Sequence, residues 1–358
     1  MKLLFLLFPL VYLCGNVYLY WRSLQALSGL PVWFRTIWTI FFWIAAFSLF
    51  LSVGLRDVSV PDLMSRIMFK VGAVWMAFLL YMVLLLLVVD VIRFFGVLLN
   101  GRFWYCLVIV ALLLVGGSIT YHRPKVVHME MKVDKPFERD RFRIVAVSDV
   151  HLGHGTGTKA LGKYVDLINS QSPDVILIAG DLIDNSVAPL LMHPFDRELS
   201  RLAAPVYMVP GNHEYISDIE ACAEYLSRTG INLLRDSVVT LPEGIQLVGR
   251  DDVSKPGRLP LDTLLSSTDA SRPVIVLDHQ PYELAHADSL GVDIQISGHT
   301  HAGQIWPLTM VVDGMYEQSR GYRKWSHAHI WVSSGLSLWG PPFRIGSRSD
   351  MAVIDVVR

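Results

Sequence analysis

Five short polar motifs in the second half of the chain carry residue types that bind metal ions. Each motif directly follows an apolar run of the kind that forms a buried strand. The motifs are Ser148-Asp149-Val150-His151, Gly180-Asp181, Gly211-Asn212-His213-Glu214, Asp278-His279 and Gly298-His299-Thr300-His301. Because ligands gather at the carboxyl ends of strands in an α/β sheet, we expect these motifs to form one site.

The motifs offer more donor groups than one divalent ion needs. The candidate ligands are imidazole, carboxylate and amide side chains, namely Asp149, His151, Asp181, Asn212, His279, His299 and His301. They predict two metal ions, with Asp181 in a position to bridge them. Asp149 and His151 are two residues apart, so on the extension of one strand both would point to the same side and reach one ion.

The histidines outside these motifs lack that context, and we expect them to be ordinary core or surface residues. They include His154, His193, His286, His327 and His329. His128 alternates with apolar residues in a half-buried strand over Val127–Val133, which predicts that it is exposed.

The pattern of the globular part favours an α/β fold of one domain. Helices are expected over Lys159–Ser170, Phe195–Leu202 and Asp218–Thr229, between early strands. The strands that precede the motifs are expected at Phe142–Val147, Val175–Ala179, Val206–Val209, Val274–Leu277 and Ile294–Ile296, and others at Gln246–Val248, Ile330–Ser333 and Met351–Val356. Many strands with few late helices indicate two sheets packed face to face, with helices outside.

The first third of the chain has a different composition. Residues 1–121 hold no histidine or glutamate, three aspartates and eight lysines or arginines, a formal charge of +5. Residues 122–358 hold all twelve histidines and carry a formal charge of −6. We therefore predict a four-helix transmembrane anchor over 1–121 and a catalytic domain over 122–358.

Four apolar stretches are each long enough to cross a bilayer, which takes about 20 residues. They are Leu3–Tyr20, Ile37–Leu55, Val71–Val89 and Trp104–Tyr121. Buried helices of a soluble domain would need a polar face, which residues 76–89 lack. Asp90 is expected at the membrane surface because an uncharged stretch ends just before it.

Four spans would place both chain ends on one side of the membrane, together with six cations: Lys2, Arg56, Arg66, Lys70, Arg123 and Lys125. The other side would hold four: Arg22, Arg35, Arg93 and Arg102. By the positive-inside rule, six against four favours a cytoplasmic catalytic domain.

Other patterns exclude several classes of site. Three scattered cysteines form neither a disulfide framework nor a zinc motif. The segment Gly157–Tyr164 fits a P-loop spacing but lacks its Ser or Thr and its leading strand, so we expect a loop and helix start. Nucleic-acid binding is not indicated, because no basic stripe with interleaved aromatics occurs. Cations that could contact a substrate phosphate, although surface charge is the default, are Lys255, Arg258, Arg320, Arg323 and Arg344.

The ordered motif set resembles the calcineurin-like metallophosphoesterase superfamily, whose pattern runs D-x-H, G-D, G-N-H-(D/E), H, G-H-x-H. Glu214, Gly303 and the tail with Ser334-Gly335, Gly340 and Arg344 look closest to its membrane-associated YkuE/YaeI-like branch. The four-span anchor departs from relatives with a signal sequence or a single span. The resemblance implies a four-layer α/β/β/α metallophosphoesterase sandwich, preceded here by an all-α transmembrane region.

The resemblance also implies a division of the ligands between two divalent ions, Mn, Fe, Zn or Mg. One ion would take Asp149, His151, Asp181 and His301, and the other Asp181, Asn212, His279 and His299. Two such ions lower the pKa of a shared water, so that a metal-bridged hydroxide attacks phosphorus in line with the leaving oxygen. His213 adjoins a ligand and is the predicted general acid, with Glu214 as its orienter or a structural neighbour.

We therefore predict a membrane-anchored phosphoesterase, with a phosphodiesterase favoured, whose partners are a phosphate-ester substrate, soluble or lipid-linked, and the membrane bilayer. A lipid pyrophosphatase of the UDP-2,3-diacylglucosamine hydrolase kind is the alternative enzyme. A non-catalytic membrane binding or signalling protein is the alternative class, although no ligand of the motif set is missing.

Overall fold

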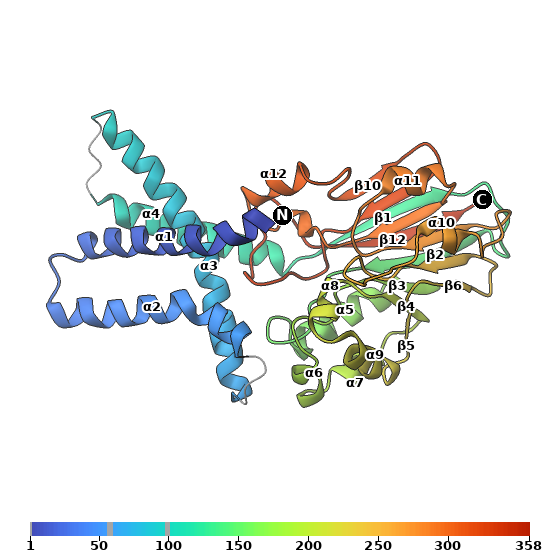
Figure 1. The fold of residues 1–358 in the computed structure, drawn as a ribbon, viewed down its shortest axis with the longest axis horizontal. Coiled ribbons are helices and arrows are strands. Elements are labelled where there is room, and N and C mark those ends of the chain that lie inside the picture. Colours follow the sequence, from blue (N-terminus) through green and yellow to red (C-terminus); the bar gives the residue numbers. More distant parts are fainter. Residues whose placement is uncertain (1, 56–59, 97–100) are drawn as a thin grey trace. The chain divides into compact units, whose positions relative to one another are not determined.

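The computed structural model describes residues 2–55, 60–96 and 101–358, and the chain forms two compact units (Figure 1). The helical unit consists of Met1–Ile119 with Gly340–Phe343, and the sandwich unit of Thr120–Trp339 with Arg344–Arg358.

The helical unit is built from long apolar helices. Its described helices are α1 (Lys2–Ala26), α2 (Val32–Gly54), α3 (Asp62–Phe94) and α4 (Arg102–Tyr121). Of these, α2, α3 and α4 are long and apolar enough to cross a membrane. The third and fourth predicted spans lie within α3 and α4, and the second lies within α2 except for its last residue, Leu55. The first predicted span, Leu3–Tyr20, lies in α1, which is not among the three. Arg56, one of the cations in the orientation argument, lies outside the described residues.

Two kinds of side chain in this unit bear on the predicted membrane anchor. Large apolar residues are exposed along α4, including Val108, Leu112 and Val115, as expected for a surface that faces lipid. Asp90 of α3 pairs with Arg22 of α1 at 2.7 Å and accepts a hydrogen bond from the Tyr18 hydroxyl. The carboxylate that follows the third predicted span is therefore neutralised by a cation that follows the first.

The sandwich unit contains two mixed sheets of six strands each within the described residues. The first sheet has the order β1 (Lys125–Lys132), β12 (Asp350–Val357), β2 (Arg141–Val147), β3 (Val175–Ala179), β4 (Val206–Val209) and β5 (Ile231–Leu233). The second has the order β10 (Gly321–Lys324), β11 (His329–Val332), β9 (Ile294–Ser297), β8 (Val274–Leu277), β7 (Gln246–Gly249) and β6 (Ser237–Thr240).

The five strands that precede the motifs run parallel to one another within each sheet. In the first sheet β2, β3 and β4 pair in parallel register, and in the second β8 pairs with β9 in the same way. Their carboxyl ends therefore lie at one edge of each sheet. These strands begin and end within one residue of the predicted runs.

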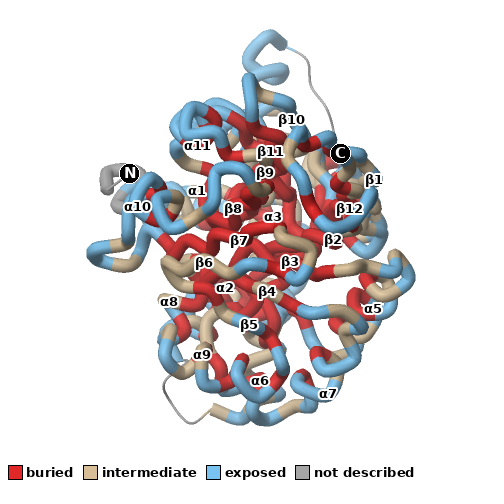
Figure 2. Tube along the Cα trace, turned by 90° about the vertical axis from the view of Figure 1, so that its right-hand side faces the viewer, coloured by how far each residue is buried: buried red, intermediate tan, exposed pale blue. Residues whose placement is uncertain are grey.

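Apolar side chains fill both faces of each sheet, which gives four layers. Ile144 and Leu177 of the first sheet share a buried cluster with Ile275 and Ile296 of the second, so the two sheets pack face to face. The alternate residues pack under helices on the outside. Figure 2 shows the inner strands largely buried and the outer helices exposed on their far sides. The α/β/β/α sandwich predicted from the sequence is confirmed.

The outer helices of the first sheet are α5 (Thr158–Asn169), α6 (Ala188–Met192), α7 (Phe195–Leu199), α8 (Asn212–Ile216) and α9 (Ile219–Ser227). Those after β7 are α10 (Leu261–Leu265), α11 (Leu284–Ser289) and α12 (Leu308–Asp313), with a 3-10 turn, η1 (His301–Gly303). The three predicted helices correspond to α5, α7 and α9. Gly157 precedes α5 as its N-cap residue, so the P-loop-like segment is a loop and helix start, as predicted.

Candidate metal centre

The backbone at the predicted ligands departs from the strand geometry expected from the sequence. Asp149, His151, Asp181, His299 and His301 all have φ between 49° and 70°, a left-handed conformation that side chains rarely adopt. The period-two argument for Asp149 and His151 is therefore wrong, because neither residue continues the strand. The two side chains converge through left-handed turns, and such strain concentrates at functional sites.

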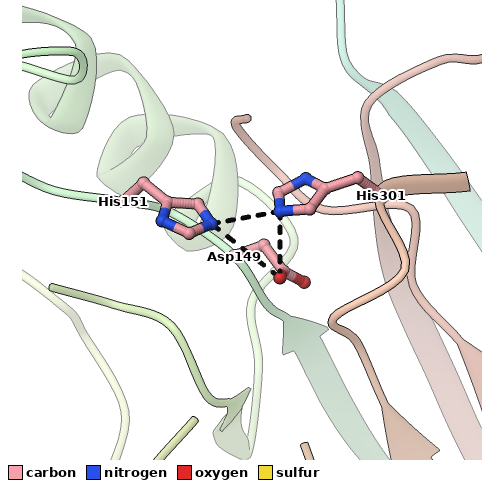
Figure 3. A group of neighbouring side chains, drawn as sticks. All are labelled: Asp149, His151 and His301. Atoms are coloured by element: carbon pink, nitrogen blue, oxygen red, sulfur yellow. Dashed lines mark hydrogen bonds and ion pairs between the residues drawn. The ribbon is translucent and has the colours of Figure 1, made fainter. Parts of the chain in front are cut away.

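Asp149, His151 and His301 form a first group of candidate ligands (Figure 3). The Nε2 atoms of His151 and His301 lie 3.1 Å apart, and Asp149 Oδ1 lies 3.3 Å from His301 Nε2 and 3.9 Å from His151 Nε2. Three donor atoms from two motifs thus face one point.

Asp181, His279 and His299 form a second group. Asp181 Oδ2 lies 3.2 Å from His279 Nε2, and Asn212 Oδ1 lies 3.3 Å from the same nitrogen. His279 Nδ1 donates a hydrogen bond to the carbonyl oxygen of Ala179 at 2.7 Å, which leaves Nε2 to face the site. Four motifs contribute to this group.

Asp181 lies between the two groups. Its Oδ2 is 3.2 Å from His279 of the second group and 3.8 Å from His151 of the first. Its Oδ1 accepts a hydrogen bond from the backbone N–H of His213 at 2.9 Å. The structure therefore brings all seven predicted ligands together, and Asp181, a member of the second group, also lies near an imidazole of the first. These seven residues are called the ligand cluster below.

His213 lies beside this cluster, with Asp184 as a close partner. Its ring centroid is 4.6 Å from that of His151, in an edge-to-face contact. Asp184 Oδ1 lies 3.2 Å from His213 Nδ1 and 3.5 Å from His151 Nδ1. Asp184 was not among the residues predicted from the sequence. Its position three residues after Asp181, in the same loop, is the signal that could have suggested it.

The sequence left open whether Glu214 orients His213 or is a structural neighbour, and its contacts favour the second role. Its carboxylate accepts hydrogen bonds from the backbone N–H groups of Asp181, Ile183 and Gly211, at 2.7 to 3.0 Å. Glu214 therefore holds two motif loops against each other. A Cβ atom at Gly211 would lie 2.2 Å from Asp181 Oδ1, which explains glycine at this position.

The donor set fits divalent cations. The carboxylates of Asp149 and Asp181 are buried, yet among the described residues neither has a lysine or arginine within ion-pair distance. Buried charge without a counter-charge is costly. Buried polar atoms that make no well-aligned hydrogen bond also gather here: Asp184 Oδ1 faces His213 Nδ1 and His151 Nδ1 only as a close contact, and His301 Nδ1 has no partner among the described residues. Mixed imidazole, carboxylate and amide donors suit Zn, Fe or Mn.

Proton affinities divide the imidazoles of the cluster. Burial disfavours the charged form of His279, but the Asp181 and Asp149 carboxylates outweigh burial and raise the pKa of His279 well above its usual range. Burial lowers the pKa of His299 to about 4 and that of His301 well below its usual range, so both imidazoles are neutral at pH 7. The neutral imidazole is the form that binds metals. Burial opposes charge on Asp181 as well, but the imidazoles of His279 and His213 hold the pKa of this carboxyl well below its usual range.

His213 differs from His299 and His301 in its proton affinity. Burial disfavours its charged form, but the carboxylates of Asp181 and Asp184 outweigh burial and raise the pKa of His213 to about 9. The side chain is therefore protonated at neutral pH and able to donate a proton.

The other singled-out residues lie outside the ligand cluster. His128 is exposed, as predicted, and none of the remaining histidines belongs to a candidate metal group of the described residues. Arg344 is neither a surface charge nor a phosphate contact, because it is buried and donates to the carbonyl oxygens of His301, Ser334 and Ser337. It fixes the loop that carries His301.

Arg258 and Lys255 also differ from the surface-charge expectation. Arg258 is nearly buried against Asp278, and Lys255 pairs with Asp236 at 2.9 Å. Arg320 and Arg323 are exposed, as expected by default; Arg320 pairs with Asp313, and Arg323 lies over the ring of Trp325.

Known proteins are similar in sequence to the part of the chain that carries the candidate metal centre. Residues 142–303 match the family model described as calcineurin-like phosphoesterase. A transmembrane protein with metallophosphoesterase domain from Danio rerio is 36% identical over 268 residues, which cover 69% of this chain and 61% of that protein. An uncharacterized metallophosphoesterase of Campylobacter jejuni is 24% identical over 377 residues, 99% of each chain. YkuE of Bacillus subtilis, an uncharacterized metallophosphoesterase, is 28% identical over 67% of this chain and 90% of that protein.

These similarities cover different parts of the molecule. The chain spans about three fifths of the length of the Danio rerio relative, whereas the Campylobacter jejuni relative matches it from end to end, helical unit included. The family match begins at β2, ends at η1, and includes every predicted ligand. The chain therefore carries a calcineurin-like metallophosphoesterase domain.

Proposed function

We propose that residues 122–358 are a dimetal-dependent phosphoesterase domain that acts on phosphodiesters, and that four helices within residues 1–121 anchor it in the membrane. The observation that carries the catalytic part is the position of Asp181. One oxygen of its buried carboxylate faces imidazoles of both ligand groups, as a bridging ligand must.

The ligand cluster would hold the two ions in the division implied by the resemblance. Asp149, His151, Asp181 and His301 would bind one ion, and Asp181, Asn212, His279 and His299 the other. When bound, two divalent cations supply Lewis acidity, which lowers the pKa of a water to about 7 and stabilises charge on phosphate oxygens.

His213 is the proposed general acid. Its Nδ1 faces Asp184, so the proton for the leaving oxygen is the one on Nε2. Asp184 is a positioning residue, because its carboxylate raises the pKa of His213 and lies within 3.5 Å of an imidazole nitrogen of both His213 and His151. A protonated imidazole turns an alkoxide into a better leaving group, an effect of roughly 10² to 10⁴ in rate.

The test is metal content and substrate preference, measured on the full chain in detergent. The protein is stripped with a chelator, reloaded separately with Mn²⁺, Zn²⁺, Fe²⁺ or Mg²⁺, and its bound metal counted. Each form is assayed with bis(4-nitrophenyl) phosphate, 4-nitrophenyl phosphate and a lipid pyrophosphate. We expect two ions per chain and the highest kcat/KM on the diester.

Other results would select other functions. The highest kcat/KM on the lipid pyrophosphate would favour the alternative enzyme, a hydrolase of the UDP-2,3-diacylglucosamine kind. Two bound ions without hydrolysis of any substrate would favour a binding or signalling protein. One ion per chain would contradict the bridging role of Asp181.

The membrane part of the proposal rests on the apolar helices and on the Arg22–Asp90 pair. These two residues follow the first and third predicted spans, and a chain that crosses four times has both of those ends on one side. The cation count favours a cytoplasmic catalytic domain.

Orientation can be tested with one exposed position of the sandwich unit. Lys132→Cys is introduced into a variant without native cysteines, and intact cells are treated with a membrane-impermeant thiol reagent. A cytoplasmic domain is labelled only after permeabilisation, whereas labelling of intact cells would reverse the orientation.

A further inference from the structure

A cavity of about 650 Å³ lies between the ends of the two sheets, apart from the ligand cluster. Its walls come from the edge strands β1 and β10 and from their neighbours β12 and β11, together with the loop before β12. None of the seven candidate ligands lines it, although Ala302, the residue after His301, does. Its volume falls in the range of ligand pockets, about 300 to 1,000 Å³.

The cavity combines an apolar wall with a cationic rim. Val127 and the almost fully buried Trp331 contribute apolar surface, whereas Lys125 and Arg348 are exposed cations. Among the described residues neither cation has a carboxylate within ion-pair distance. Arg320 adds a third cation, whose exposed pair with Asp313 is a weak one.

Asp350 also lines the cavity, but its carboxylate does not neutralise the cations of the rim. The carboxylate of Asp350 is buried and accepts hydrogen bonds from the Ser333 hydroxyl and the Ser334 backbone N–H. The cavity walls are thus cationic where they meet solvent, and this distinguishes them from a merely structural pocket.

Aromatic residues add to the apolar wall. Trp331 and Tyr322 both line the cavity, and they are paired across β11 and β10. The wall can therefore take the less polar atoms of a ligand, while the rim offers positive charge.

Chain connectivity keeps this rim near one end of an apolar helix. Lys125 is four residues after Tyr121, the last residue of α4, so the two lie within about 14 Å of each other along even a fully extended chain. Cations this close to the end of a membrane-crossing helix meet anionic headgroups, with about 1 kcal/mol gained per lysine or arginine.

We propose that this cavity binds an anionic phosphate compound, with phosphate oxygens at Lys125 and Arg348, and less polar atoms against Val127 and Trp331. Two kinds of ligand would match these cations and the apolar wall: the headgroup of an anionic phospholipid, or a soluble organic phosphate. The cavity is separate from the ligand cluster, so the proposal holds whether or not the chain hydrolyses phosphodiesters.

The test is native mass spectrometry of the full chain in detergent with phosphatidylglycerol, phosphatidylcholine of the same acyl chains, or glycerol 1-phosphate. The variant Lys125→Gln with Arg348→Gln removes two rim cations. Its matched control, Lys132→Gln with Arg358→Gln, removes two exposed cations from the opposite ends of the same strands, β1 and β12. A third variant, Trp331→Phe, removes the indole N–H and keeps an aromatic ring.

We expect the rim variant to bind phosphatidylglycerol roughly 10- to 30-fold more weakly, and the control variant and Trp331→Phe to bind it like the wild type, because the indole N–H is buried. Glycerol 1-phosphate that binds with the same dependence on the rim would assign the site to a soluble phosphate, and binding of the lipid alone would assign it to the headgroup. Equal losses in rim and control variants, or equal binding of phosphatidylcholine, would overturn the proposal.

Discussion

Asp278 and His279 are neighbours in the sequence, yet they belong to two buried polar clusters with opposite charge balance. Asp278 receives Arg250 Nη1 at 2.8 Å and Arg258 Nη2 at 2.6 Å, so two cations surround one buried carboxylate. His279 faces Asp181 in the ligand cluster, where imidazoles are the partners of every carboxylate. Among the described residues, the first cluster, called the arginine cluster below, contains guanidinium cations, and the ligand cluster contains no lysine or arginine.

We infer from this difference that the arginine cluster stabilises the fold and that the ligand cluster binds metal ions. Buried ions that are paired and hydrogen-bonded hold a fold in one arrangement, whereas buried carboxylates without cations are tolerated where a cation binds. Changes in the arginine cluster should therefore unfold the protein, and changes in the ligand cluster should inactivate it.

The largest effect is expected from Asp181→Asn in the ligand cluster. The amide removes the charge shared by both ligand groups, while its oxygen can still accept the His213 backbone N–H. We expect turnover to fall roughly a thousand-fold or more, because the charge stabilisation supplied by bound cations amounts to several kcal/mol. Metal analysis should show fewer than two ions per chain, and wild-type turnover with full metal content would contradict the bridging role.

Asp278→Asn should act on stability instead. Two nearly buried guanidinium groups would lose their charged partner, and breaking a buried pair costs about 3 to 5 kcal/mol. The measurement is the melting temperature of the full chain in detergent. The matched control is Asp166→Asn, which breaks an exposed pair with Arg201 and should cost about 1 kcal/mol or less. A similar melting temperature for both variants would remove the distinction between the two clusters.

His213→Ala tests the protonated side chain beside the ligand cluster. We expect metal content to stay at two ions and the rate on alkyl esters to fall roughly 10²- to 10⁴-fold, because the leaving alkoxide needs a proton. Nitrophenyl esters should lose much less, since nitrophenolate leaves without one. Equal losses on both ester types would remove His213 from the acid role.

Asp184→Asn should have a smaller effect, visible mainly in the pH dependence. Asp181 and Asp184 together raise the pKa of His213 to about 9, so the wild-type rate should fall only as pH rises toward and above that value. Without the Asp184 charge this pKa falls, and the alkaline limb of the kcat profile should move to lower pH. A lower rate with an unmoved limb would indicate a structural role alone.

The arrangement of the strands and the choice of candidate ligands were predictable because both depend on local residue types. β3 and β8 are short runs of β-branched and aliphatic residues, buried on both faces, and their ends coincide with the runs seen in the sequence. The short strands β5, β6 and β10 were missed because residues such as Asn232, Ser237 and Arg323 interrupt the apolar pattern at sheet edges.

Contacts between distant segments were not predictable in this way. Arg344 reads as a surface cation, and only the folded chain shows it enclosed by carbonyl oxygens of the His301 loop and the segment after β11. The left-handed turns at the ligands were missed because Asp and His carry no signal for positive φ as strong as glycine does.

Removal of residues 1–119 should have the smallest effect on the rate of hydrolysis. It tests whether the sandwich unit works without the long apolar helices. A truncated protein should begin at Thr120, because the Tyr121 hydroxyl lies 3.0 Å from Ser337 Oγ in the sandwich interior. We expect it to fold, to bind two ions and to hydrolyse a soluble diester at a rate close to that of the full chain. On a diester embedded in vesicles its rate should fall about 10²-fold or more, since a tethered site meets lipid at a high effective concentration. Equal rates of both proteins on every lipid would indicate a water-soluble natural substrate, whereas failure of the truncated protein to fold or to bind metal would show that the helices belong to the catalytic core.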